Sequence, residues 1–164
     1  MTVFTILKQD HKKVAALFKE IKSTTSHGRK TRADLFDQIK FELDVHTKVE
    51  EDILYPICKD FSQTHKLALE AYEEHHIAKV LLKELATMDK DTEEWMAKLI
   101  TLEENIAHHI KEEEKELFPK TEDKLNKDQI QALTDQIKEM KQRYEDQNEY
   151  NILERLYRSV VGRE

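Results

Sequence analysis

The chain has 164 residues, of which 38% are apolar and 37% are charged, and its formal net charge is −7. This length suits a single domain with its own hydrophobic core. The negative charge argues against nonspecific binding to nucleic acid or to anionic membranes. Only two glycines and two prolines interrupt the sequence, so the composition favours long amphipathic helices.

The single cysteine, Cys58, cannot form an internal disulfide bond, which fits a reducing compartment. The apolar stretch at residues 3–7 is too short for a signal peptide or a membrane span. We therefore expect a soluble, cytoplasmic protein that contacts neither membrane nor nucleic acid.

Apolar residues spaced alternately three and four apart predict four successive helices. The first covers about residues 5–23 and the third about residues 64–88. Thr31 is expected to cap the second helix, with Asp34 as its acidic partner, and Thr92 is expected to cap the fourth. Four helices of similar length with short connections imply an all-α, up-down-up-down four-helix bundle.

Two prolines fall at matching places in this pattern. Proline cannot donate a backbone hydrogen bond to the preceding turn of a helix. Pro56 should therefore kink or end the second helix, and Pro119 should end the fourth.

The last part of the chain is also helical in pattern, from about residue 126 to 161, as one helix or two. We expect residues 1–120 to form the bundle and residues 121–164 to form a C-terminal helical extension. This extension either packs on the bundle or mediates association with a second copy or another protein, through apolar residues such as Ile152.

A motif of histidine, three residues and glutamate occurs twice, as His46 with Glu50 and as His109 with Glu113. Each copy is followed four residues later by Leu-aromatic-Pro. Residues four apart lie on one face of a helix, so the imidazole and the carboxylate can converge on one point. The segment beginning at His11 also matches the segment beginning at His75, so the two halves of the bundle resemble each other.

These polar residues interrupt the apolar stripes of the four helices, and burying them without partners would be costly. At about 1.5 Å of rise per residue, their heights along the bundle differ by one turn or less. We therefore expect one buried layer of six side chains, formed by His11, His46, Glu50, His75, His109 and Glu113.

Four imidazoles and two carboxylates are more ligands than one tetrahedral zinc ion uses, and this mixture suits iron. Two ions roughly 3.5–4 Å apart, bridged by Glu50 and Glu113, would use the whole set. The hypothesis is a carboxylate-bridged non-haem site with two iron ions as cofactor.

This combination of one histidine and one His-x-x-x-Glu in each half resembles the hemerythrin-like (HHE cation-binding) family over about residues 1–120. The resemblance implies a hemerythrin-like bundle whose di-iron centre binds or senses O2, NO or peroxide, or handles iron under oxidative or nitrosative stress. It also implies the ligands His11, His46, Glu50, His75, His109 and Glu113. The alternative is a di-iron enzyme that consumes peroxide or nitric oxide.

The sequence departs from oxygen-carrying hemerythrins at two positions. Lys79 stands where those proteins have a further histidine, and Glu113 or Glu114 stands where they have an aspartate. A site with one histidine fewer leaves one iron more open, which favours sensing or redox chemistry over oxygen transport. A ferritin-like site would need Glu-x-x-His on two helices, and only Glu73 with His76 has that spacing.

Some assignments stay open at this stage. His108 and Glu112 form an overlapping His-x-x-x-Glu, although His109 continues the apolar stripe and aligns with the first motif. His76 is an alternative to His75, or an additional ligand. Tyr72, one turn from His75, either packs in the core or lines the metal pocket.

Overall fold

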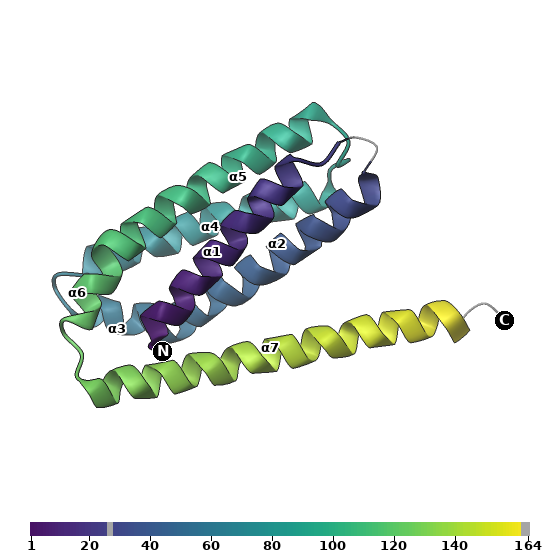
Figure 1. Cartoon of the computed structure of the whole chain (residues 1–164). Coiled ribbons are helices and arrows are strands. Elements are labelled where there is room, and N and C mark those ends of the chain that lie inside the picture. The colour runs from purple at the N-terminus through teal and green to yellow at the C-terminus, as the bar shows by residue number, and fades with distance from the viewer. Residues whose placement is uncertain (26–27, 162–164) are drawn as a thin grey trace.

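A computed structural model describes residues 1–25 and 28–161 of the chain. All of the regular structure in these ranges is helical (Figure 1). The elements are α1 (Val3–Lys22), α2 (Arg29–Val49), η1 (Glu50–Leu54), α3 (Tyr55–Asp60), α4 (His65–Thr87), α5 (Glu93–Glu112), η2 (Glu113–Leu117), α6 (Phe118–Glu122) and α7 (Lys127–Val161). No helix in the described ranges is long and apolar enough to cross a membrane.

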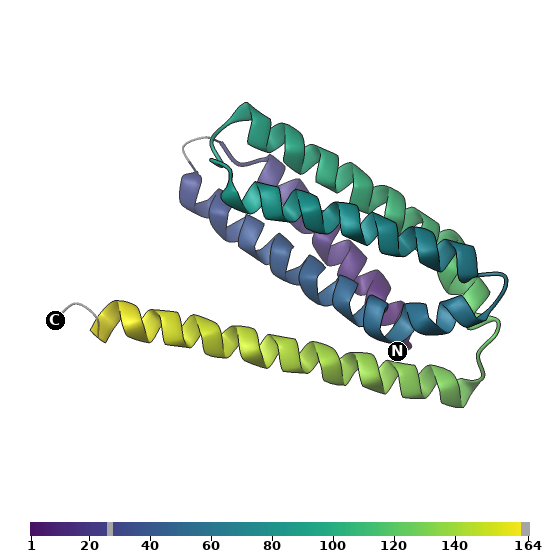
Figure 2. The same ribbon diagram turned by 180° about the vertical axis from the view of Figure 1, so that it is seen from behind.

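The first four long helices form the predicted up-down-up-down bundle. The α1–α2 hairpin lies beside the α4–α5 hairpin (Figures 1 and 2). Each hairpin continues through a five-residue π-helical segment, η1 or η2, into a short helix, α3 or α6. The two halves therefore repeat the same order of elements, as the sequence repeat indicated.

The predicted caps are confirmed at one helix and wrong at another. Thr92 caps α5, because its hydroxyl accepts a hydrogen bond from the Trp95 amide at 3.2 Å. In contrast, α2 begins at Arg29, with Gly28 at the N-cap position and no side-chain cap. Thr31 therefore lies inside the first turn of the helix and does not start it.

The helix is interrupted next to Pro56, as expected, but the expectation that Pro119 ends the fourth helix needs correction. The helical path does not end at Pro56 or Pro119 but continues to Asp60 and Glu122. The π-helical segments precede the prolines, and the Tyr55 amide bonds the Glu50 carbonyl five residues back. The wider turn accommodates a residue that cannot make the usual i to i−4 bond, and each proline then occupies the first turn of a new helix, where no donor is needed.

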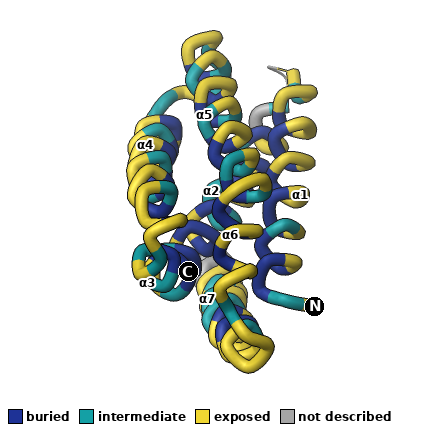
Figure 3. The backbone as a smooth tube through the Cα atoms, turned by 90° about the vertical axis from the view of Figure 1, so that its left-hand side faces the viewer, coloured by how far each residue is buried: buried dark blue, intermediate teal, exposed yellow. Residues whose placement is uncertain are grey.

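The bundle core consists of two apolar clusters on either side of a buried polar layer. One cluster lies toward the α1–α2 loop and includes Phe18, Phe36 and Trp95. The other lies toward the N-terminus and includes Phe4 and Leu54. Buried positions follow the inner faces of all four long helices (Figure 3). The polar layer is therefore closed off from solvent above and below.

The C-terminal segment is one continuous helix, α7, which decides between the one-helix and two-helix readings. It packs against α1, α2 and η1 (Figures 1 and 3). Leu133 and Ile137 are buried in the second apolar cluster, and Thr134 Oγ1 accepts a hydrogen bond from the Val3 amide at 2.9 Å. Farther along, Ile152 and Leu153 are exposed. The first half of α7 thus completes the core.

Cys58 should be unreactive in the folded protein. Its side chain is fully buried beside Thr121, and burial raises the pKa of the thiol to about 12. Because the thiolate is the reactive form, a water-soluble thiol reagent at mildly alkaline pH should label Cys58 only after denaturation. Mass spectrometry of native and denatured samples measures this, and rapid labelling of the native protein would contradict it.

Candidate metal centre

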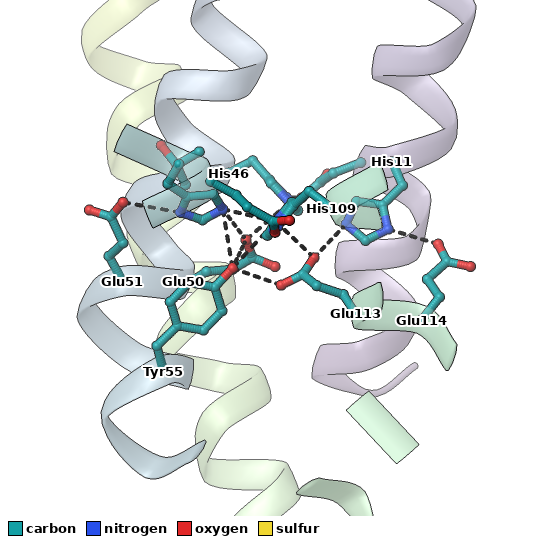
Figure 4. A network of polar contacts seen from close by, with 12 residues as sticks. His11, His46, Glu50, Glu51, Tyr55, His109, Glu113 and Glu114 are labelled. Carbon is teal, nitrogen blue, oxygen red and sulfur yellow. Dashed lines mark hydrogen bonds and ion pairs between the residues drawn. The ribbon is translucent and has the colours of Figure 1, made fainter. Parts of the chain in front are cut away.

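All six side chains expected in the polar layer meet inside the bundle. Figure 4 labels five of them: His11, His46, Glu50, His109 and Glu113. Each is between 0% and 4% exposed. The histidines come from the four long helices, and the two glutamates begin the π-helical segments η1 and η2. The layer consists of His11, His46, Glu50, His75, His109 and Glu113.

The two carboxylates lie between histidines of different helices. Glu50 Oε2 is 3.1 Å from His46 Nε2 and 3.4 Å from His75 Nε2. Glu113 Oε2 is 3.3 Å from both His11 Nε2 and His109 Nε2. The carboxylates are therefore placed where each can bridge two positions.

The candidate ligand atoms fall into two overlapping sets. One set joins His11 and His46 with both glutamates, and the other joins His75 and His109 with Glu50. Within each set the atoms lie within 4.8 Å of one another. Two imidazole nitrogens and shared carboxylate oxygens in each set suit two divalent ions better than one.

The outer nitrogen of every histidine in the layer contacts a carboxylate. His11 Nδ1 is 2.7 Å from Glu114, and His109 Nδ1 is 2.7 Å from Glu74. The other two contacts, which are longer, join His75 Nδ1 to Glu51 at 3.0 Å and His46 Nδ1 to Asp10 at 3.4 Å. A proton held on Nδ1 by a carboxylate leaves Nε2 as the lone-pair donor, which is the arrangement of metal-bound histidines.

These outer carboxylates follow the internal repeat. Asp10 and Glu74 each precede a histidine of the layer, and Glu51 and Glu114 each follow a glutamate of the layer. Every one contacts a histidine on a different helix. The signal was present in the sequence as the paired Asp/Glu-His and Glu-Glu dipeptides, but only the packing of the helices tells which histidine each carboxylate reaches.

Tyr55 is a seventh member of the layer that sequence reasoning missed. Its hydroxyl is 2.7 Å from Glu113 Oε1 and 3.1 Å from His75 Nε2, and the residue is fully buried. The π-helical turn stacks residues five apart, so it brings the hydroxyl to 3.2 Å from Glu50 Oε2 (Figure 4). The corresponding aromatic residue of the other half, Phe118, has no hydroxyl; its ring stacks on His11 and packs against Phe4.

Charge inside the layer is balanced by protons on His46 and His109 when no cation is bound. Burial opposes charge on His46, but Glu50 and Asp10 outweigh burial and raise the pKa of His46 to about 10. Burial also opposes charge on His109, yet Glu113 and Glu74 raise its pKa well above the ordinary value. Binding of metal dications would displace these protons, because metal ligation requires the free lone pair.

Unsatisfied polar atoms provide a test of whether a metal fits. Four buried atoms of the layer have no hydrogen-bond partner: His11 Nε2, His46 Nε2, Glu50 Oε1 and Glu113 Oε2. Leaving buried polar groups unpaired is costly. All four belong to the set around His11 and His46, so a cation at that point would satisfy them together. The residues therefore fit a metal site.

The structure distinguishes between the alternative ligands that the sequence left open, because they lie in different places. His108 and His76 are exposed on the outer surfaces of α5 and α4, whereas their neighbours His109 and His75 are buried in the layer. Lys79 also points away from the layer and pairs with Glu51 at 2.6 Å. Tyr72 packs against the ring of Tyr55 and donates a hydrogen bond to the Glu51 carbonyl, so it supports the layer from outside.

A small cavity adjoins the layer on the side opposite Tyr55. Its volume is about 10 Å³, which is the room that one water-sized molecule needs. All four histidines of the layer line it, and Val14, Leu43 and Ile106 form apolar walls.

The fold and the buried His/Glu clusters define a helical-bundle protein with a candidate metal site. Comparison with known families agrees, because the Hemerythrin HHE cation binding domain matches residues 2–121. The chain belongs to the hemerythrin HHE cation-binding family, and the predicted resemblance is confirmed.

Two known proteins are similar to this chain. The structure of a Hemerythrin HHE cation binding domain-containing protein from Mycobacterium kansasii is 22% identical, covers 93% of this chain and 92% of that chain, and gives a TM-score of 0.80. This likeness confirms the predicted fold, including the C-terminal helix. A protein from Nostoc sp. named DNA nickase is 26% identical over 144 residues, which span 86% of this chain but 39% of the relative.

Proposed function

We propose that the chain is a non-haem di-iron protein whose centre binds or senses a small oxidant or diatomic ligand: O2, NO or peroxide. The observation that carries this proposal is the pair of ligand sets sharing Glu50. The proposed ligands are the six residues of the layer, with Glu50 and Glu113 bridging. When bound, iron would supply redox chemistry and open coordination positions for the ligand.

The cavity above the layer supports a small ligand. A volume of about 10 Å³ beside the four histidines admits a molecule of a few atoms and excludes larger substrates. The apolar walls formed by Val14, Leu43 and Ile106 favour an uncharged or weakly polar guest. The rest of the core on that side is closely packed apolar side chains, which limits access of bulk water.

We propose that Tyr55 supplies the second ligand set with an oxygen in place of the further histidine that oxygen-carrying hemerythrins have. The sequence has Lys79 at that further position, and Lys79 lies outside the layer. We propose that the Tyr55 oxygen binds the metal held by His75 and His109. A phenolate stabilises ferric iron, so this ligand favours sensing or redox chemistry, including consumption of peroxide or nitric oxide, over reversible oxygen transport.

We do not propose that this chain nicks DNA, the activity in the name of the Nostoc relative. Nicking of DNA is the activity named for a protein of which this chain spans 39%. The net charge of −7 opposes the phosphate contacts on which DNA binding depends. We therefore propose a small ligand and no nucleic acid as the partner.

Replacing a proposed ligand should remove metal. We expect two iron ions per chain in the wild-type protein after anaerobic reconstitution, and a loss of at least one ion in His46→Ala and in His109→Ala. Each substitution removes an Nε2 donor from a different ligand set. Elemental analysis counts the ions, and optical spectra before and after exposure to air test for ligand binding.

His76→Ala is the matched control, because His76 is an exposed histidine on α4 beside the buried His75. This variant should retain both ions. Wild-type iron content in both His46→Ala and His109→Ala would contradict the proposal. Sustained loss of peroxide or nitric oxide, rather than stoichiometric binding, would identify an enzyme.

A further inference from the structure

The four outer carboxylates differ in how their charge is neutralised. Asp10 and Glu51 each pair with a lysine, Lys141 and Lys79 respectively. Glu114 is 35% exposed and open to water. Glu74 is only 16% exposed, and within the described ranges no lysine or arginine pairs with it.

Another histidine and another glutamate lie beside Glu74 in place of a lysine. His108 Nε2 is 3.4 Å from Glu74 Oε1 and 3.4 Å from Glu112 Oε1. The second oxygen of Glu74 faces inward and contacts His109 Nδ1 at 2.7 Å. Two carboxylates therefore converge on one imidazole, and no lysine or arginine among the described residues pairs with either of them.

The two hairpins of the bundle can be compared directly, because they repeat the same elements. The α1–α2 hairpin is covered by α7, and Lys141 of α7 reaches Asp10. In the other half, Glu74 holds the place of Asp10. There α4 and α5 lie on the side away from α7 (Figure 2), and they border an open groove of about 610 Å³ that contains Glu74, His108 and Glu112. The α4–α5 hairpin, which α7 does not cover, therefore has no lysine in the place that Lys141 takes beside Asp10.

The three side chains form a suitable metal-binding face. His108 and Glu112 repeat the His-x-x-x-Glu spacing one residue ahead of His109 and Glu113, which rotates the pair by about 100° to the surface of α5. Glu74 adds an oxygen from α4, and the three ligand atoms lie within 4.8 Å of one another. One imidazole nitrogen and two carboxylate oxygens, with water completing the shell, suit Mn²⁺, Fe²⁺ or Zn²⁺.

We propose that Glu74, His108 and Glu112 form a second, solvent-facing site for a divalent transition-metal ion. The site is separate from the buried layer but touches it through Glu74, which contacts His109. Four glutamates and one lysine line the groove. The lysine, Lys66, pairs with Glu70 at 3.5 Å, so the remaining carboxylates keep the potential of the groove negative, which attracts cations. A basic side chain from another protein would satisfy the carboxylates alone, whereas a metal ion also uses the imidazole of His108.

The test is a titration of the full chain with Mn²⁺ at neutral pH. The electron paramagnetic resonance signal of free Mn²⁺ measures how much of the added metal remains unbound. Wild type, His108→Ala and Glu112→Gln are compared after the same iron reconstitution. The wild-type protein should take up one more equivalent of Mn²⁺ than either variant. His108 and Glu112 side chains are 61% and 38% exposed, so both variants should keep the fold, which thermal unfolding checks.

His76→Ala is again the control, since it removes an exposed imidazole of α4 outside the cluster; it should match wild type. Equal Mn²⁺ uptake by all four proteins would overturn the proposal, and is the result expected if the groove receives a basic side chain of a partner. All four proteins have the same buried layer. The difference in Mn²⁺ uptake therefore tests the second site whether or not the buried layer holds two irons.

Discussion

Replacing Tyr55 by phenylalanine should abolish the visible absorption of the oxidised, iron-loaded protein. A phenolate oxygen on ferric iron absorbs visible light by charge transfer from ligand to metal, and phenylalanine has no such oxygen. Without a cation, burial and the neighbouring carboxylates of Glu113 and Glu50 raise the pKa of Tyr55 well above its ordinary value, so the phenol stays protonated. A bound metal ion would reverse this preference by stabilising the phenolate anion.

The measurement is an optical spectrum of reconstituted protein after oxidation, together with its iron content. Tyr72→Phe is the matched control, because Tyr72 packs on the Tyr55 ring but bonds only the Glu51 carbonyl. The control should keep the visible band. A band of undiminished intensity in Tyr55→Phe would show that the phenol is a hydrogen-bonding neighbour and not a ligand.

Replacing Ile137 by alanine should destabilise the whole bundle by about 2–5 kcal/mol. Ile137 lies on α7, is fully buried, and packs in the same apolar cluster as residues of α1 and η1. This cost is a large part of the ~5–15 kcal/mol that holds a typical domain folded. Chemical denaturation, monitored by circular dichroism, gives the change in the free energy of unfolding.

Leu153→Ala on the same helix is the control, since Leu153 is 58% exposed. It should change the free energy of unfolding by less than about 0.5 kcal/mol. Truncation after Asn126 extends the test by removing all of α7. A truncated chain that keeps wild-type stability and metal would contradict the packing role and support the alternative in which the helix binds a partner.

The sequence by itself determined the class of the fold and the buried polar layer. Apolar residues spaced three and four apart specify amphipathic helices through local geometry alone. His46 with Glu50, and His109 with Glu113, share a helix face for the same reason. Their places in the apolar stripes predicted that they are buried, and the structure buries both pairs.

Only the tertiary structure decided which groups from different helices meet. The hydroxyl of Tyr55 enters the layer because a π-helical turn precedes Pro56, and the sequence pattern indicated only that the helix is disturbed there. Asp10 reaches His46 across a helix interface and Lys141 reaches Asp10 from α7. Spacing along one helix fixes contacts within that helix, whereas contacts between helices depend on how their axes cross and rotate during packing.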